Sequence, residues 1–189
     1  MESPVRILVV DDEVNIVQVL ETLLQRQGYL VRTAANGREA LQRLQEEDFD
    51  VMVADIRMEP VDGLSLLSQA LTRQPHLAVV MMTAYAAVET ALQAMKRGAF
   101  DYICKPFRIE ELQEIVDRAV SYASALGKGT SPGEDLAKGA SMKSFLRDKE
   151  LSHIRYVLEQ CGGDRQKAAK ELGISVGMLR RKLAEPSAD

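Results

Sequence analysis

Carboxylate, hydroxyl and ammonium groups follow short apolar runs at four places in the 189-residue chain. The run 51–54 ends on Asp55, and the run 5–10 ends on Asp11 and Asp12. Two later runs end on Thr83 and Lys105. A carboxylate can attack phosphorus as a nucleophile, and hydroxyl and ammonium groups can hold phosphoryl oxygens. We therefore expect an acyl phosphate to form on Asp55 if the folded chain gathers these five residues.

The three carboxylates also predict a bound cation. If the strands that end at Asp11 and Asp55 are neighbours, then Asp11, Asp12 and Asp55 crowd one spot. Two like charges about 4 Å apart repel by roughly 4 kcal/mol at an effective dielectric constant of about 20. Such a cluster needs a cation or raised pKa values, and oxygen ligands with room for water suit Mg²⁺.

Each of these residues also has an ordinary structural explanation. An Asp at a strand end commonly caps a helix or forms a turn, and a Thr there is commonly a β-branched strand residue. Lys105 can pair with any surface acid. The combination favours the chemical explanation, because four of the five predicted strands end in a residue that the mechanism needs.

Five strand–helix units in strict alternation position these residues. Apolar runs predict strands over 5–10, 29–33, 50–54, 77–82 and 100–104, and helical spacing predicts helices over 13–27, from 37, and over 63–73, 86–97 and 109–124. In the first helix, the residues expected to face inward are Val14, Val17, Leu20, Leu23 and Leu24. The alternation predicts a five-stranded parallel, doubly wound α/β sheet with helices on both faces. Such sheets bind ligands at the carboxyl ends of their strands.

The back of the chain has a different character. Gly, Ser and Pro between small and charged residues predict a linker over 125–143, after a first domain over 1–124. Helical patterns return over 145–160, 165–172 and 176–185, with Asp164 and Ser175 as candidate N-caps. A helix, a short Gly-containing turn and a second helix indicate a small all-α helix-turn-helix domain over 144–189.

Charge and composition point to two separate tasks in the cytoplasm. Residues 1–124 hold 12 Lys and Arg against 19 Asp and Glu, whereas residues 125–189 hold 12 against 9. A basic back half suits an anionic partner. Cys104 and Cys161 lack metal-ligand spacing, which indicates reduced thiols. The chain contains no secretory leader pattern and no apolar run near 18 residues, so we expect no membrane span.

The first 120 or so residues resemble the receiver domain of two-component response regulators, which has a flavodoxin-like (CheY-like) fold. The motifs that match are Asp11-Asp12, Asp55, Thr83-Ala84, Tyr102 and Lys105-Pro106. The resemblance implies that a sensor histidine kinase phosphorylates Asp55 and that Thr83 and Lys105 hold the phosphoryl group. It also implies that Tyr102 is a rotating switch residue and that the bond before Pro106 is cis. Mg²⁺ would be bound by Asp12 and Asp55 side chains, by Asp11 through water and by the Arg57 backbone carbonyl.

The segment 158–183 resembles the C-terminal helix-turn-helix of nitrogen-regulator type response regulators and of the factor for inversion stimulation (Fis). The resemblance implies contacts with double-stranded DNA from Arg165, Lys167, Ser175, Arg180, Arg181 and Lys182. Val176 and Met178 depart from the family, which commonly has a polar or basic residue and a Thr there. The 189-residue sequence contains no G-x-x-x-x-G-K-[ST] loop, which is the nucleotide-binding motif of P-loop ATPases. We therefore expect no ATPase module of the nitrogen-regulator kind.

Together the resemblances imply a transcription regulator that phosphorylation switches between states of dimerisation and DNA binding. The expected homodimer face covers 86–97, 100–104 and 109–124, with exposed charges at Glu89, Lys96, Arg97, Asp101, Arg108, Glu111 and Arg118.

One alternative is a phosphorelay or protein-interaction module whose helix-turn-helix does not bind DNA. Another is an aspartyl-phosphate phosphohydrolase, which needs a second Asp where this chain has Arg57. We therefore expect no enzyme activity beyond the receiver's own phosphoryl transfer and slow self-dephosphorylation.

Overall fold

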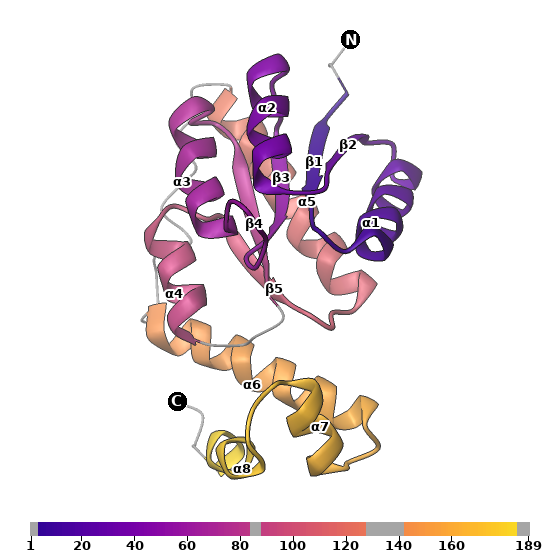
Figure 1. Ribbon diagram of the computed structural model, residues 1–189, viewed down its shortest axis with the longest axis vertical. Coiled ribbons are helices and arrows are strands. Elements are labelled where there is room, and N and C mark those ends of the chain that lie inside the picture. The colour runs from indigo at the N-terminus through magenta and orange to yellow at the C-terminus, as the bar shows by residue number, and fades with distance from the viewer. Residues whose placement is uncertain (1–3, 84–87, 128–141, 185–189) are drawn as a thin grey trace. The chain divides into compact units, whose positions relative to one another are not determined.

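A computed structural model describes residues 4–83, 88–127 and 142–184 of the chain (Figure 1). Most of the predicted linker, Ala84, the start of the helix predicted over 86–97 and the tail from residue 185 lie outside these ranges. The described residues fall into two compact units: residues 4–83, 93–103 and 108–127 belong to the first, and residues 88–92, 104–107 and 142–184 belong to the second. Within the described ranges, no helix combines the length and the apolar character needed to cross a bilayer.

A five-stranded sheet with the order β2-β1-β3-β4-β5 forms the centre of the first unit. Parallel pairing joins β1 to β2 and to β3, and β3 to β4. The strands are β1 (Arg6–Val10), β2 (Leu30–Ala34), β3 (Val51–Asp55), β4 (Ala78–Thr83) and β5 (Asp101–Cys104). This order confirms the predicted doubly wound fold and makes the strands that end near Asp11 and Asp55 neighbours.

Helices follow each strand and cover the two faces of the sheet. They are α1 (Val14–Arg26), α2 (Gly37–Glu46), α3 (Gly63–Arg73), α4 (Val88–Lys96) and α5 (Ile109–Gly127). Figure 1 shows α2 and α3 packed side by side on one face, with α1 and α5 on the other. The hydroxyl of Tyr29, beyond the end of α1, donates to Asp117 of α5 at 2.9 Å. α5 ends at Gly127, three residues into the predicted linker.

Burial explains why the central strands are continuously apolar. All five residues of β3 and all six of β4 are buried, because helices cover both faces of the sheet. In α1, Leu20 and Leu24 are buried as predicted. The prediction that Val14 faces inward was wrong, because this residue is 63% exposed. Val14 is the first residue of α1 and lies only three residues beyond the buried Asp11, at the carboxyl edge of the sheet, where the strands have already ended.

The described C-terminal part of the second unit, residues 142–184, forms the helices α6 (Met142–Gln160), α7 (Arg165–Glu171) and α8 (Val176–Ala184). A small core joins them, formed by Ile154, Val157, Ala168, Ala169, Leu172 and Leu179. Both predicted N-caps are confirmed. Asp164 accepts from the backbone N–H groups of Gln166 and Lys167, and the Ser175 hydroxyl accepts from Met178. The turn between α7 and α8 passes through Gly173, whose φ of +64° favours glycine.

Candidate functional site

Two buried carboxylates lie at the carboxyl edge of the sheet. Asp55 is the last residue of β3 and is 4% exposed, and Asp11 follows β1 directly and is 1% exposed. The register pairs Val10 with Ala54, so Asp11 and Asp55 follow on adjacent strands, whose spacing is about 4.8 Å. Two buried acids so close are costly when both are charged, unless a cation offsets them.

Backbone hydrogen bonds fix one oxygen of each buried carboxylate. The N–H of Glu13 donates to Asp11 Oδ1 at 2.9 Å, and the N–H of Arg57 donates to Asp55 Oδ2 at 2.6 Å. In each case the donor lies two residues further on, which is the geometry of an Asx turn. These turns hold the carboxylates at the rim while the chain leaves the strand.

Asp12 does not join the two buried acids in a cluster of three. It is exposed and lines an open pocket of about 560 Å³ with Ile56, Arg57, Met58, Glu59 and Asp62. In the part of the chain that the structure describes, no group of three or more His, Cys, Asp or Glu side chains is arranged to hold a metal. The predicted crowding of three carboxylates is thus corrected to two buried acids beside an exposed one, because only Asp11 continues the buried strand.

The donor chemistry of this rim nevertheless fits Mg²⁺. Asp11, Asp12 and Asp55 supply only carboxylate oxygens, and the Arg57 backbone supplies a carbonyl. Mg²⁺ is commonly bound through one or two carboxylates and keeps several waters, so it does not require a cage of three acids. The open pocket beside Asp12 leaves space for that water.

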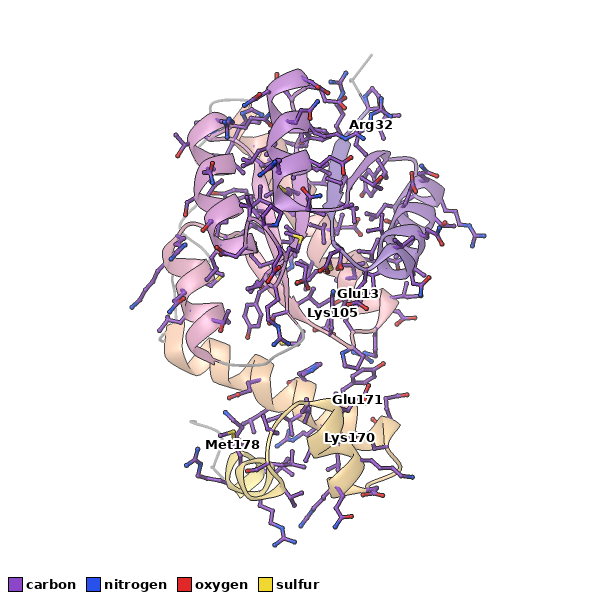
Figure 2. All side chains as sticks on the ribbon, viewed as in Figure 1. Glu13, Arg32, Lys105, Lys170, Glu171 and Met178 are labelled. Atoms are coloured by element: carbon purple, nitrogen blue, oxygen red, sulfur yellow. The ribbon has the colours of Figure 1, made fainter. Side chains whose placement is uncertain are left out.

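The hydroxyl residue ends the next strand of the sheet, and the ammonium residue directly follows the strand after that. Thr83 is the last residue of β4, one position beyond Met82, which pairs with Asp55. Tyr102 is a buried residue of β5, and Lys105 follows β5 directly and is also buried (Figure 2). The Lys105–Pro106 bond is cis, as the resemblance implied, and the Glu59–Pro60 bond is cis as well.

Gly63, which the sequence marked only as part of a turn, lies against the backbone of Asp55. A Cβ on Gly63 would be 2.1 Å from the Asp55 carbonyl oxygen. The N–H of Gly63 donates to the carbonyl of Ile56 at 2.8 Å, which closes the loop after β3. Asp62 then caps α3, and the Ser65 hydroxyl that donates to Asp62 holds the pKa of Asp62 below its usual value. The Asp-Gly pair before an amphipathic helix was the available signal.

Replacing Gly63 with Ala is expected to destabilise the protein by about 1–3 kcal/mol, because the new methyl group must displace the backbone beside Asp55. Thermal unfolding of the full chain measures the effect. Gly177→Ala is the matched control, since a Cβ there meets nothing closer than the Ser175 hydroxyl at 3.9 Å. Equal melting temperatures for the two variants would show that the close contact at Gly63 is unimportant.

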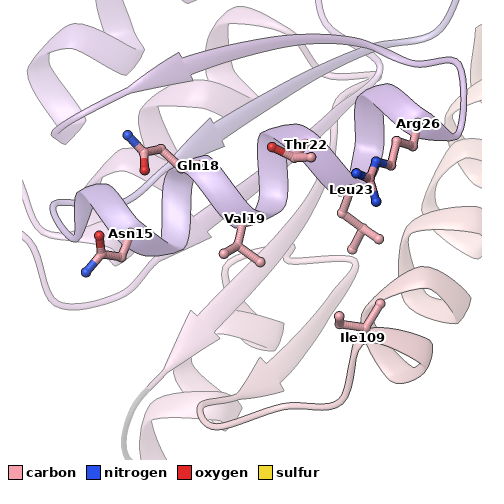
Figure 3. Close-up of a pocket in the computed structure, with 7 residues that line it drawn as sticks. All are labelled: Asn15, Gln18, Val19, Thr22, Leu23, Arg26 and Ile109. Atoms are coloured by element: carbon pink, nitrogen blue, oxygen red, sulfur yellow. The ribbon is translucent and has the colours of Figure 1, made fainter.

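An apolar groove lies between α1 and the start of α5 (Figure 3). Its volume is about 560 Å³, and its lining comprises Asn15, Gln18, Val19, Thr22, Leu23, Arg26 and Ile109. Val19 is 55% exposed and Ile109 is 47% exposed. Val14 and Ile109 are the first residues of helices that follow β1 and β5, so exposed apolar side chains flank the carboxyl edge. The helical pattern of α1 counted only inward positions and missed this patch.

One charge of the expected dimer face is buried. Asp101 is 2% exposed, and its Oδ2 pairs with Arg118 at 2.6 Å while its Oδ1 accepts from the N–H of Tyr102. The expectation that Asp101 is exposed was wrong, because this carboxylate stabilises the β5–α5 packing. Glu89 is another charge of the expected face, and its side chain is outside the part of the chain that the structure describes.

Exposed cations gather on α7 and α8. Arg165, Lys167, Arg180 and Arg181 are all exposed, as DNA contacts require. Lys182 differs, because its ammonium pairs with Glu150 of α6 and only 22% of its side chain is exposed. The two paired residues are 32 positions apart in the sequence, and no local sequence pattern indicates that they pair. Lys182 therefore fixes α8 on α6, whereas the other four present their charge to the solvent.

Two family models match separate parts of the chain. The model described as "Response regulator receiver domain" matches residues 7–117, and the one described as "Bacterial regulatory protein, Fis family" matches residues 145–185. Among curated proteins, the transcriptional regulatory protein ZraR of Escherichia coli K12 is 38% identical over 151 residues, which are 80% of this chain and 34% of that protein. The chain thus spans about a third of the length of this relative.

Solved structures match both the first unit and nearly the whole chain. A response regulator from Burkholderia pseudomallei, solved with a phosphorylated aspartic acid, a calcium ion and citrate, is 31% identical with a TM-score of 0.61. The match covers 96% of this chain and 99% of that one. The Thermotoga maritima response regulator TrrA, solved with Mg²⁺-BeF, is 35% identical with a TM-score of 0.56, over 61% of this chain and 98% of that one.

Proposed function

This chain belongs to the response regulator receiver family and carries a Fis-family segment, and we propose that it is a two-component transcription regulator switched by phosphorylation of Asp55. The observation that carries the proposal is the pair of buried carboxylates, Asp11 and Asp55, at the ends of adjacent strands of one sheet. The next strand ends at Thr83, and Lys105 directly follows the strand after that. A sensor histidine kinase would supply the phosphoryl group, and double-stranded DNA would be the target of the second unit.

The transfer step uses Asp55 as the nucleophile. A carboxylate oxygen of Asp55 forms a bond to the phosphorus of a phosphohistidine, while the P–N bond breaks and its electron pair returns to the imidazole. Mg²⁺ held by Asp12, Asp55, the Arg57 carbonyl and, through water, Asp11 would offset charge on the phosphoryl oxygens. Thr83 would donate a hydrogen bond to the product, and Lys105 would contribute positive charge. Slow self-dephosphorylation would return the chain to its resting state.

The kinase would dock on the apolar groove between α1 and α5. The groove presents Val19 and Ile109 next to the carboxyl edge, where a histidine must arrive to reach Asp55. Exposed apolar patches of this kind are typical of protein interaction sites. A helical surface of a kinase that carries its phosphohistidine beside an apolar stripe would fit both requirements.

The output would pass through Tyr102 and a homodimer. Phosphorylation replaces one negative charge on Asp55 with about two and adds strong acceptor oxygens, which would draw the Thr83 hydroxyl toward them. Tyr102 would then move, and the face of α4, β5 and α5 would pair with a second copy. A dimer would set two copies of α8 about one DNA turn apart.

The experiment that tests this proposal compares the full chain before and after treatment with acetyl phosphate and Mg²⁺. We expect tighter retention on a pool of genomic DNA fragments and a doubled mass by light scattering. Unchanged DNA affinity together with unchanged mass would refute the switch. A second outcome, a larger mass with binding that does not depend on salt, would favour the protein-interaction module, because phosphate contacts weaken steeply as salt rises.

A further inference from the structure

The first turn of α8 presents few groups that can form hydrogen bonds with bases. Its first three residues are Val176, Gly177 and Met178, and the hydroxyl of the capping Ser175 accepts from the N–H of Met178 at 3.1 Å. Helix-turn-helix proteins contact base edges with the N-terminal residues of the second helix. In this chain Val176 and Met178 have only apolar side chains to offer, and Gly177 has no side chain.

Met178 is turned outward, whereas its apolar neighbours are turned inward. Leu179 is fully buried in the core of the second unit, and Val176 and Leu183 pack against that core. Met178 is 37% exposed (Figure 2), and within residues 150–183 it is the one large hydrophobic side chain left in the solvent. The core does not bury it, so its apolar side chain is available to contact another molecule.

Gly177 has no internal reason to be glycine. At Gly63 and Gly37 a Cβ would meet atoms at 2.1 and 2.8 Å, but at Gly177 the nearest atom is the Ser175 hydroxyl at 3.9 Å. Its φ also lies outside the left-handed region. Because glycine weakens a helix relative to alanine, the missing side chain points to the close approach of another molecule.

The charge around this turn identifies the kind of partner. Arg180 and Arg181 are exposed on α8, and Arg165, Lys167 and Lys170 are exposed on α7. Residues 125–189 together carry 12 Lys and Arg against 9 Asp and Glu. A pair of helices that presents exposed cations and an exposed apolar side chain fits duplex DNA, whose phosphates flank a groove that contains the 5-methyl groups of thymine.

We propose that Met178 packs against the 5-methyl group of a thymine in the major groove, and that Gly177 lets α8 approach closely enough for this contact. The inference rests on the proposed function, since it assumes that α8 enters DNA. It assigns the specificity of the first turn of α8 to a methyl group instead of a hydrogen bond, and it gives a role to Met178, which stands where the Fis-type family commonly has a Thr.

Deoxyuridine provides the sharpest test, because it removes the thymine methyl group and nothing else. A duplex is first selected from a random-sequence pool with the phosphorylated full chain, and each thymine is then replaced in turn. We expect one replacement in each half-site to weaken binding about fourfold, the effect of one buried methyl group. Met178→Ala should weaken binding to the thymine duplex by a similar factor and should be insensitive to that replacement.

Gly177→Ala separates close approach from folding. The methyl group that this substitution adds to α8 meets no protein atom closer than 3.9 Å, so the melting temperature should not fall. Affinity for the selected duplex should nevertheless drop at least tenfold. The inference is overturned if no thymine replacement affects the wild type, if Met178→Ala keeps the wild-type sensitivity, or if Gly177→Ala binds normally. Selection of no duplex at all would overturn the proposed function as well, so the two failures are distinguishable.

Discussion

Asp55→Asn should reduce labelling of the full chain by acetyl phosphate at least a thousandfold, to background. The amide lacks a nucleophilic oxygen, and the loss of a nucleophile removes nearly all of the rate that its site provides. The measurement is intact-protein mass spectrometry in Mg²⁺. Asp62→Asn is the matched control, because Asp62 lies on the same rim but is an exposed cap, and Asn caps helices equally well.

The same variant has a second expected effect that does not depend on transfer. Asp55→Asn removes the repulsion between two carboxylates, of which Asp11 is 1% exposed and Asp55 is 4% exposed. Without Mg²⁺ the variant should therefore melt at a higher temperature than the wild type. Added Mg²⁺ should raise the melting temperature of the wild type more than that of the variant, because binding to the folded state stabilises it. Labelling of Asp55→Asn at the wild-type rate would contradict the assignment.

The double variant Arg180→Ala and Arg181→Ala should lower DNA affinity about a hundredfold in 0.1 M salt, if each arginine provides a contact of about 1–3 kcal/mol. The slope of log affinity against log salt should fall by about 0.9 for each phosphate contact that is lost. Fluorescence anisotropy across a salt series measures both quantities on the selected duplex.

Two other cations of the second unit serve as controls for this variant. Arg155 is exposed on α6, outside the predicted contact set, so Arg155→Ala should bind nearly as the wild type does. Lys182 pairs with the buried Glu150, so Lys182→Met should lower the melting temperature, since it leaves a buried charge without its partner. If Arg155→Ala weakened binding as strongly as the double variant, the loss of affinity would reflect the overall positive charge of the unit and not contacts made by Arg180 and Arg181.

The sequence alone was sufficient to place the residues of the first unit at one edge of a sheet. Continuous apolar runs mark buried parallel strands, and the residue after each run must lie at the carboxyl edge. That reasoning positioned Asp55 and Thr83 at the ends of β3 and β4. The helix caps Asp164 and Ser175 were also predictable, because capping depends on residues only two or three positions away.

Contacts that depend on packing between distant segments were not predictable. Nothing near Lys182 in the sequence indicates that it pairs with Glu150, and nothing near Asp101 indicates that it pairs with Arg118. The close contact of Gly63 with the Asp55 backbone depends on how the loop after β3 returns. Val14 follows the helical pattern of α1, but the sheet ends before it can be covered. The periodicity of a helix shows which side is apolar and does not show how far its partner extends.

Peptide mapping of the phosphorylated chain tests the central claim most directly. The full chain is treated with acetyl phosphate in Mg²⁺ or in EDTA, digested, and sequenced by mass spectrometry to find the modified carboxylate. We expect a phosphoryl group on Asp55 alone, present with Mg²⁺ and nearly absent in EDTA. A phosphoryl group on Asp11, Asp12 or another residue, or equal labelling without the metal, would contradict it.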